Sequence, residues 1–273
     1  MPLRPHAAAL EDLYDRLNRR GYVEPDPLQF LYDYPDAADR EIVALVASAL
    51  AYGRVKQILT SVSDALARLG RRPGAFVSEA SPETLREAML GFKHRFSDGS
   101  NLAALLTGAA AAIRTHGSLQ RCFLAGMGRD DETVLPAAGA FVEALRRGTR
   151  GECGHLLSDP ARGSACKRLH LMLRWLVRRD DVDPGGWHDV PAAKLIVPLD
   201  THMHRLARQL GATRRRAADG KTAMETTAAF RALCPGDPVK YDFALTRLGI
   251  RADMNADEFL ARCQGKPQGQ RRA

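Results

Sequence analysis

The chain has 273 residues, of which 40 are Lys or Arg and 32 are Asp or Glu, so its net charge is +8. A chain of this length can bury one large or two small cores without disulfides or metal ions, and its positive charge predicts an anionic partner. Its apolar segments exclude an integral membrane protein, because the longest, residues 102–113, is too short to span a bilayer.

Apolar residues recur every three or four positions along most of the chain, and alternating β-branched residues are rare, which predicts an all-α fold. The expected helices cover residues 10–17, 42–52, 55–69, 81–90, 101–115, 133–146, 164–178, 201–210, 221–233, 238–248 and 255–263. Gly53 is expected to separate the second helix from the third. We expect a proline-rich connector over residues 24–35, a turn over 180–186 and one short extended piece over 194–197. The polar, basic tail 264–273 is expected to be disordered.

The five cysteines are widely scattered and form no Cys-x-x-Cys pair. This spacing argues against a zinc or iron–sulfur site and predicts reduced thiols. Residues 1–9 lack the apolar core of a signal peptide. We therefore expect a cytoplasmic protein without a metal or a membrane partner.

The excess of positive charge is concentrated in one part of the chain. Residues 160–216 contain twelve Lys or Arg and five Asp, a local charge of +7. Two residues with specific chemical potential lie within this segment. Asp200 opens the predicted helix 201–210, and Lys167 lies near the start of the predicted helix 164–178, 33 positions earlier.

The sequence around Asp200 reads Val197-Pro198-Leu199-Asp200-Thr201-His202-Met203-His204-Arg205-Leu206-Ala207. It resembles the catalytic helix start of the helix-hairpin-helix DNA glycosylases, the superfamily of endonuclease III and the 8-oxoguanine glycosylases. The segments 163–175 and 238–245 resemble an uncharacterised bacterial family distantly related to that superfamily. The resemblance implies a two-lobed helical, glycosylase-like fold with a central cleft. One lobe would cover residues 36–150, and the other residues 1–35 together with 151–263.

Two features depart from the superfamily pattern. Its hairpin carries Leu-Pro-x-Gly-x-Gly, whereas residues 157–163 read Leu-Ser-Asp-Pro-Ala-Arg-Gly and retain only Gly163. The spacing from Lys167 to Asp200 is longer than usual and is similar to that of the divergent archaeal 8-oxoguanine glycosylases. The iron–sulfur loop of endonuclease III has no counterpart here, so we expect no cofactor. By this analogy the favoured lesion is 8-oxoguanine.

The resemblance implies base-excision repair by a monomeric, nucleoid-associated glycosylase and AP lyase. Lys167 would attack the anomeric carbon, and a helix amino end with Arg168 beside it favours the neutral amine that this attack needs. Asp200 would stabilise the positive charge that develops on the sugar. The damaged base must first leave the duplex. The alternative is structural: Asp200 is a helix N-cap and Lys167 is a solvated surface lysine.

The remaining candidate residues would bind DNA. Tyr52, Arg54 and Lys56 surround Gly53, where the superfamily places a DNA-probing loop, although the segment also fits a simple joint between two helices. Arg95 lies between Phe92 and Phe96, which would stack on a base or form one buried face. The other candidates lie near the catalytic pair and are Arg162, Gly163, Arg168, His170, His202, His204, Arg205, Arg214 and Arg215. Structural histidines and a solvated arginine patch are the alternatives for this group.

Two other functions fit parts of the sequence. The segment 195–204 resembles the first strand of an amidohydrolase barrel, in which His202 and His204 would bind a divalent metal. Only 69 residues follow His204, too few for a barrel that takes about 250 residues. The stronger rival is a helical nucleic-acid-binding protein that keeps the glycosylase fold without its chemistry. Catalysis requires the Lys167 amine and the Asp200 carboxylate to face one cleft, about 4 to 6 Å apart, close enough for charge coupling.

Overall fold

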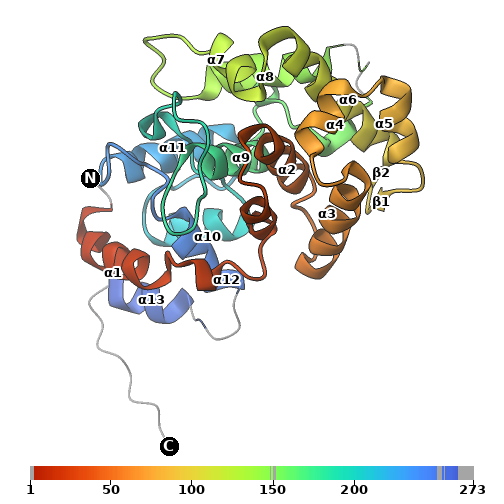
Figure 1. Ribbon diagram of the computed structural model, residues 1–273. Coiled ribbons are helices and arrows are strands. Elements are labelled where there is room, and N and C mark those ends of the chain that lie inside the picture. Colours follow the sequence, from red (N-terminus) through yellow and green to blue (C-terminus); the bar gives the residue numbers. More distant parts are fainter. Residues whose placement is uncertain (1–2, 148, 150–151, 251–253, 255, 264–273) are drawn as a thin grey trace, which may run out of the picture.

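The chain folds almost entirely into helices, as the computed structural model shows for residues 3–147, 149, 152–250, 254 and 256–263 (Figure 1). The α-helices are α1 (Ala7–Leu17), α2 (Ala37–Ala49), α3 (Val55–Leu69), α4 (Pro73–Glu79), α5 (Pro82–Ala88), α6 (Gly99–His116), α7 (Leu119–Ala125), α8 (Leu135–Arg146), α9 (Lys167–Val177), α10 (Thr201–Gln209), α11 (Gly220–Arg231), α12 (Asp242–Ile250) and α13 (Ala256–Cys263). A small antiparallel hairpin joins β1 (Lys93–His94) to β2 (Ser97–Asp98). Short 3-10 helices fill several connections. The predicted all-α class is confirmed.

Every predicted helix has a counterpart, but the sequence reading missed α4, α7 and the hairpin. Each of the two helices has seven residues, which is too short to show a clear apolar period. The predicted extended piece at residues 194–197 forms no strand, because a 3-10 helix (Ala192–Lys194) precedes it and Val197 N donates to the Thr227 side chain. The predicted disordered tail, residues 264–273, lies outside the described residues.

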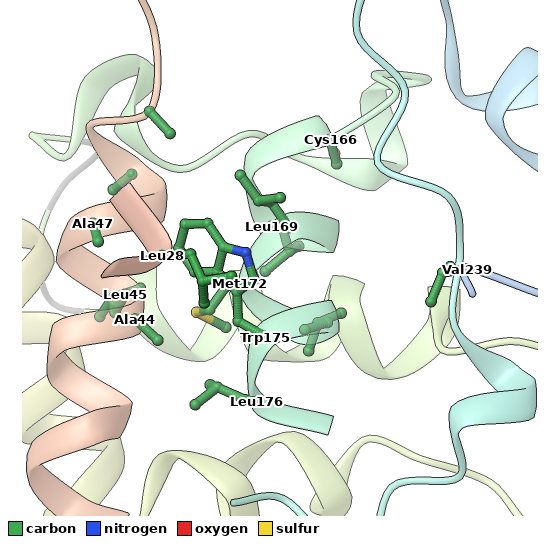
Figure 2. Close-up of a cluster of buried hydrophobic side chains, with 14 of the residues drawn as sticks. Leu28, Ala44, Leu45, Ala47, Cys166, Leu169, Met172, Trp175, Leu176 and Val239 are labelled. Carbon is green, nitrogen blue, oxygen red and sulfur yellow. The ribbon is translucent and has the colours of Figure 1, made fainter. Parts of the chain in front are cut away.

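Helix α2 runs through the middle of the fold. Its residues are buried without interruption from Glu41 to Ala49, so it is covered on every side. Helix α9 packs along it, and Trp175 and Met172 of α9 lie close to Ala44 and Leu45 of α2 (Figure 2). This contact fixes α9, and with it the position of Lys167 at its first turn, relative to α2.

The other helices gather on either side of this pair (Figure 1). Helices α4, α5, α7 and α8 all contact the long helix α6, while α1 contacts α12 and α13, and α10 contacts α12. One continuous hydrophobic cluster includes residues of both groups. The predicted division into lobes at residues 36 and 150 stays a prediction. None of the described helices is both long and apolar enough to cross a membrane.

A glycine allows α6 and α8 to cross closely. A Cβ on Gly108 would lie 1.9 Å from the carbonyl oxygen of Leu145, so Gly108→Ala must push the helices apart. We expect this change to destabilise the protein by about 1 to 3 kcal/mol. A Cβ added to Gly139 of α8 would have no atom of the described residues within 4 Å, so Gly139→Ala should be neutral or slightly stabilising. Urea unfolding of both variants tests the crossing, and equal stabilities would contradict it.

Candidate functional site

A cavity of about 590 Å³ lies where the first turns of α9, α10 and α12 meet the connection between α2 and α3. Its wall combines apolar side chains with several charged ones. The lining includes Tyr52, Gly53, Lys167, Arg168, Arg174, Asp200 and Asp242.

Lys167 and Asp200 face each other in this cavity. Lys167 is the first residue of α9, and its Nζ lies 3.9 Å from Oδ2 of Asp200. The other oxygen, Oδ1, caps α10 by accepting a 2.8 Å hydrogen bond from Met203 N. Both side chains keep about a third of their surface exposed, 30% and 37%. The distance between the amine and the carboxylate falls at the short end of the expected range. Asp200 is also the N-cap of α10, because each of its carboxylate oxygens has its own partner.

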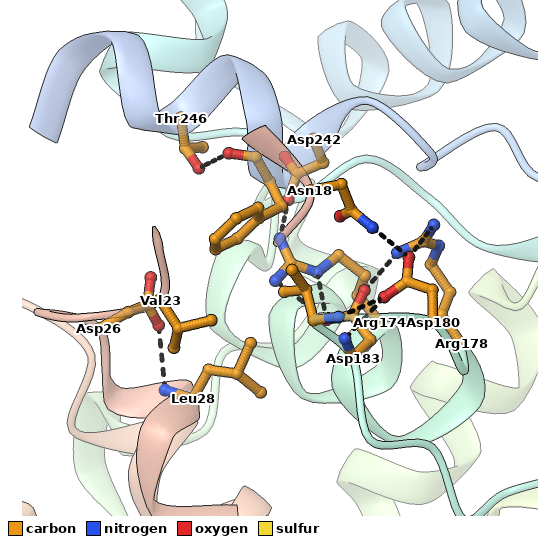
Figure 3. A network of polar contacts seen from close by, with 12 residues as sticks. Asn18, Val23, Asp26, Leu28, Arg174, Arg178, Asp180, Asp183, Asp242 and Thr246 are labelled. Carbon is orange, nitrogen blue, oxygen red and sulfur yellow. Dashed lines mark hydrogen bonds and ion pairs between the residues drawn. The ribbon is translucent and has the colours of Figure 1, made fainter. Parts of the chain in front are cut away.

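A buried ionic network holds α9 in place two turns beyond Lys167 (Figure 3). Arg174 pairs with Asp183 at 3.1 Å and with Asp242 of α12 at 2.5 Å. Arg178 pairs with Asp183, Asp180 and, at 2.9 Å, Asp237. The two arginines are at most 5% exposed, so they are not available to an anionic partner. Two of the twelve cations counted in residues 160–216 are therefore enclosed with their aspartates and are not part of the surface.

Asp242 is a site residue that sequence reasoning missed. It lines the cavity and is 3% exposed, and its Oδ1 has no hydrogen-bond partner among the described residues. Burial raises the pKa of Asp242, and the Arg174 guanidinium opposes that rise. The Asp200 carboxylate also raises the pKa of Asp242, and the Lys167 ammonium lowers it. The charge on Asp242 therefore depends on the candidate catalytic pair. The available signal was an acidic residue within the apolar run of residues 241–245.

Tyr52 and Arg168 form hydrogen bonds between separate segments of the chain at the cavity wall. The Tyr52 hydroxyl donates to the carbonyl oxygen of His94 at 2.9 Å. The Arg168 guanidinium donates to the carbonyl oxygens of Ala49, at 2.6 Å, and His155, and it lies 5.0 Å from the Tyr52 ring. Tyr52 is half-buried and its hydroxyl is engaged within the protein, while its predicted role in probing DNA stays a prediction. Arg168 joins the start of α9 to the end of α2 instead of extending toward a phosphate.

The three candidate histidines are buried or partly buried. His170 is 3% exposed and does not line the cavity, so its predicted contact with DNA is wrong. His202 packs so tightly against α12 that a Cβ on Gly249 would lie 2.1 Å from its ring. His204 is 9% exposed and hydrogen-bonds the carbonyl oxygen of Arg215 at 3.0 Å. His202 and His204 thus have different neighbours, and the all-α fold of the described residues excludes the metal-binding barrel.

The remaining candidates lie around the site. Arg54, Lys56, Arg95, Arg162, Arg205 and Arg214 are exposed. Arg205 and Arg214, with Arg208, line a second hollow of about 490 Å³ beside α10. Arg215 is instead paired with Asp219 at 2.8 Å.

Gly163 forms the turn before α9. Its φ of +74° suits glycine, and its carbonyl oxygen accepts a 2.9 Å hydrogen bond from Gly220 N at the start of α11. Gly163 therefore fixes the approach to Lys167.

His170 predicts how stability responds to acid. Burial lowers its pKa from 6.5 to about 4. As the pH falls, His170 of the unfolded chain therefore becomes protonated near pH 6.5, whereas His170 of the folded chain stays neutral down to about pH 4. The free energy of unfolding decreases as the pH falls through this window, because only the unfolded state binds the proton. Between pH 7 and pH 5 we expect the wild type to lose about 2 kcal/mol relative to His170→Leu. The exposed His188→Leu should lose stability in parallel with the wild type. Urea unfolding at each pH measures this, and a constant difference between wild type and His170→Leu would contradict it.

Comparison with known proteins places the chain in a family. Searches of the curated proteins and of the solved structures gave no match. A family model described as "Protein of unknown function (DUF2400)" matches residues 26–251, which include both Lys167 and Asp200. The chain therefore belongs to the DUF2400 family.

Proposed function

We propose that the protein is a DNA glycosylase with AP lyase activity, acting on a damaged base that has left the duplex. The observation that carries this proposal is the position of the Lys167 amine, 3.9 Å from the Asp200 carboxylate at a cavity of about 590 Å³. Cavities of this size accommodate small ligands, and a flipped nucleoside fits within that range. The resemblance to the helix-hairpin-helix glycosylases supports the same assignment and favours 8-oxoguanine as the lesion.

The two residues suit distinct steps of the reaction. The neutral amine of Lys167 attacks C1′, the glycosidic bond breaks, and the base leaves with the bonding electrons and takes up a proton from water. The Asp200 carboxylate stabilises the positive charge on the sugar. The attacking nitrogen loses one proton to water, and cleavage of the C1′–O4′ bond then leaves its electron pair on O4′, which takes up a proton, so that a protonated Schiff base forms at C1′. Removal of a C2′ proton then expels the 3′ phosphate, and water releases Lys167.

The protein around the pair supports this chemistry by fixing its geometry. Asp200 cannot turn freely, because its Oδ1 is held by Met203 N. Arg174 anchors α9 to α12 through Asp242 at 2.5 Å, and α12 contacts α10. The helix that carries the amine and the helix that carries the carboxylate are therefore braced against a common neighbour. Such preorganisation matters because a small displacement of a reacting group can cost orders of magnitude in rate.

Exposed cations beside the cavity provide the complementary surface for DNA. Arg205, Arg208 and Arg214 line the hollow next to α10, and Arg54 and Lys56 follow Gly53 on the cavity's other side. Clustered Lys and Arg bind phosphates by releasing condensed counterions, so the proposed binding should weaken steeply with salt. We propose that the protein acts as a monomer on chromosomal DNA.

Borohydride trapping tests the lyase reaction directly. Wild-type protein is incubated with duplexes that carry 8-oxoguanine, uracil, thymine glycol or an abasic site, and borohydride reduces any Schiff base to a stable adduct. We expect an adduct with the abasic site and with at least one lesion. Lys167→Gln should form none and should still bind DNA, while the exposed Lys221→Gln serves as the matched control and should trap normally.

Asp200→Asn separates charge from capping, because asparagine caps a helix as well as aspartate does. We expect this variant to keep the wild-type unfolding midpoint and to excise the base about 10²- to 10³-fold more slowly, since one electrostatic contribution to the transition state is lost. Single-turnover kinetics give the rate. Intact DNA binding without any adduct would overturn the enzyme proposal and favour a binding protein, whereas trapping by Lys167→Gln would overturn only the choice of nucleophile.

A further inference from the structure

The hairpin of β1 and β2 presents an aromatic ring to solvent. Phe96 lies in its turn and is 78% exposed, whereas Phe92, four positions earlier, is 2% exposed. The expectation that these rings form one buried face is therefore wrong for Phe96. Leu90 is the other large hydrophobic side chain exposed to this degree among the described residues.

The turn that carries Phe96 is firmly held. His94 is fully buried and hydrogen-bonds Ser61 at 2.8 Å and the carbonyl oxygen of Tyr52 at 3.1 Å. The Tyr52 hydroxyl returns a hydrogen bond to the His94 carbonyl and another to Ser97 on the second strand. Both strands are thus tied to the end of α2. Phe96 is exposed on an anchored turn.

A row of rings connects Phe96 to the candidate site. The ring of Phe96 lies 6.2 Å from that of His155, and His155 lies 4.9 Å from Tyr52. Tyr52 lines the cavity that holds Lys167. Phe96 is therefore the outer end of a row of three rings, packed edge to face, whose inner end is Tyr52 at the cavity wall.

Positive charge accompanies the exposed ring. The Arg95 guanidinium lies 5.2 Å from the Phe96 ring and 6.0 Å from the Tyr52 ring. It packs directly over Gly53, where a Cβ would come within 2.5 Å of it. Three other cations are exposed nearby in the sequence: Lys93 on β1, and Arg54 and Lys56 at the start of α3. An aromatic platform among cations is suited to a stacked base with its flanking phosphates.

We propose that Phe96 stacks on the DNA base next to the nucleotide that enters the cavity, with Arg95 contacting the adjoining phosphate. This inference rests on the proposed function, because it takes the cavity as the place of the extruded nucleotide. It assigns the contact with the base stack to the hairpin turn and not to Tyr52, whose hydroxyl and ring are already engaged. The partner is nucleic acid because the cations and the row of rings leading to Lys167 complement a phosphate chain and its bases.

A non-reactive duplex tests the contact separately from the chemistry. The full chain is titrated with a duplex that carries a tetrahydrofuran abasic analogue, which forms no Schiff base, flanked by 2-aminopurine. Anisotropy gives the affinity, and 2-aminopurine emission reports stacking. Phe96→Ala should bind about tenfold more weakly and lose the protein-induced quenching. Phe96→Trp should retain both, and Leu90→Ala, which removes a side chain of 80% exposure, should match the wild type.

The outcomes separate the two proposals. If Phe96→Ala binds and quenches as the wild type does while the wild type traps normally with borohydride, the stacking role is overturned and the lyase stands. If Phe96→Ala loses binding but no duplex gives a trapped adduct, the stacking role stands and the lyase falls. Failure of the wild type to bind any of these duplexes would overturn both.

Discussion

The two buried ion pairs of Arg174 are the constraint on which the candidate site depends. Arg174 lies in α9 and joins Asp183, in the loop that follows this helix, to Asp242 at the start of α12. Removing one member of such a network leaves a buried charge unpaired, which costs about 3 to 5 kcal/mol. An arrangement of the helices that separated Arg174 from Asp242 would carry that cost. The buried network therefore favours the packing of α9 against α12 that places Lys167 beside Asp200.

Charge serves two purposes in this chain, and burial separates them. Arg174 and Arg178 are enclosed with their aspartates and determine how the helices meet. Arg205, Arg208 and Arg214 remain at the surface beside α10. A count of charged residues along the sequence cannot separate the buried arginines from the exposed ones, because the neighbouring residues in the sequence do not show which arginine will be buried. The cations that remain exposed lie near α10 and near Gly53, and these are the surfaces that we propose for DNA.

The parts of the structure that follow from local chemistry could be predicted from the sequence. Periodicity predicts the long helices, and a capping aspartate before Thr201 places Asp200 at a helix start. Lys167 opens α9 as expected. Asp242 was missed because its partner, Arg174, lies 68 residues away, and such pairs form only in the folded chain. His170 was misassigned because a spacing of three residues from Lys167 does not determine which side of α9 faces the cavity; Leu171, not His170, lines it.

The central claim is that Lys167 is the nucleophile of a site completed by Asp200. Mass-spectrometric mapping of the wild-type protein after borohydride reduction on an abasic duplex tests it most directly, because it identifies the modified amine among all lysines and the amino terminus. The predicted result is a sugar remnant on the peptide that contains Lys167 and on no other peptide. A remnant on another amine, with Lys167 unmodified, would contradict the claim.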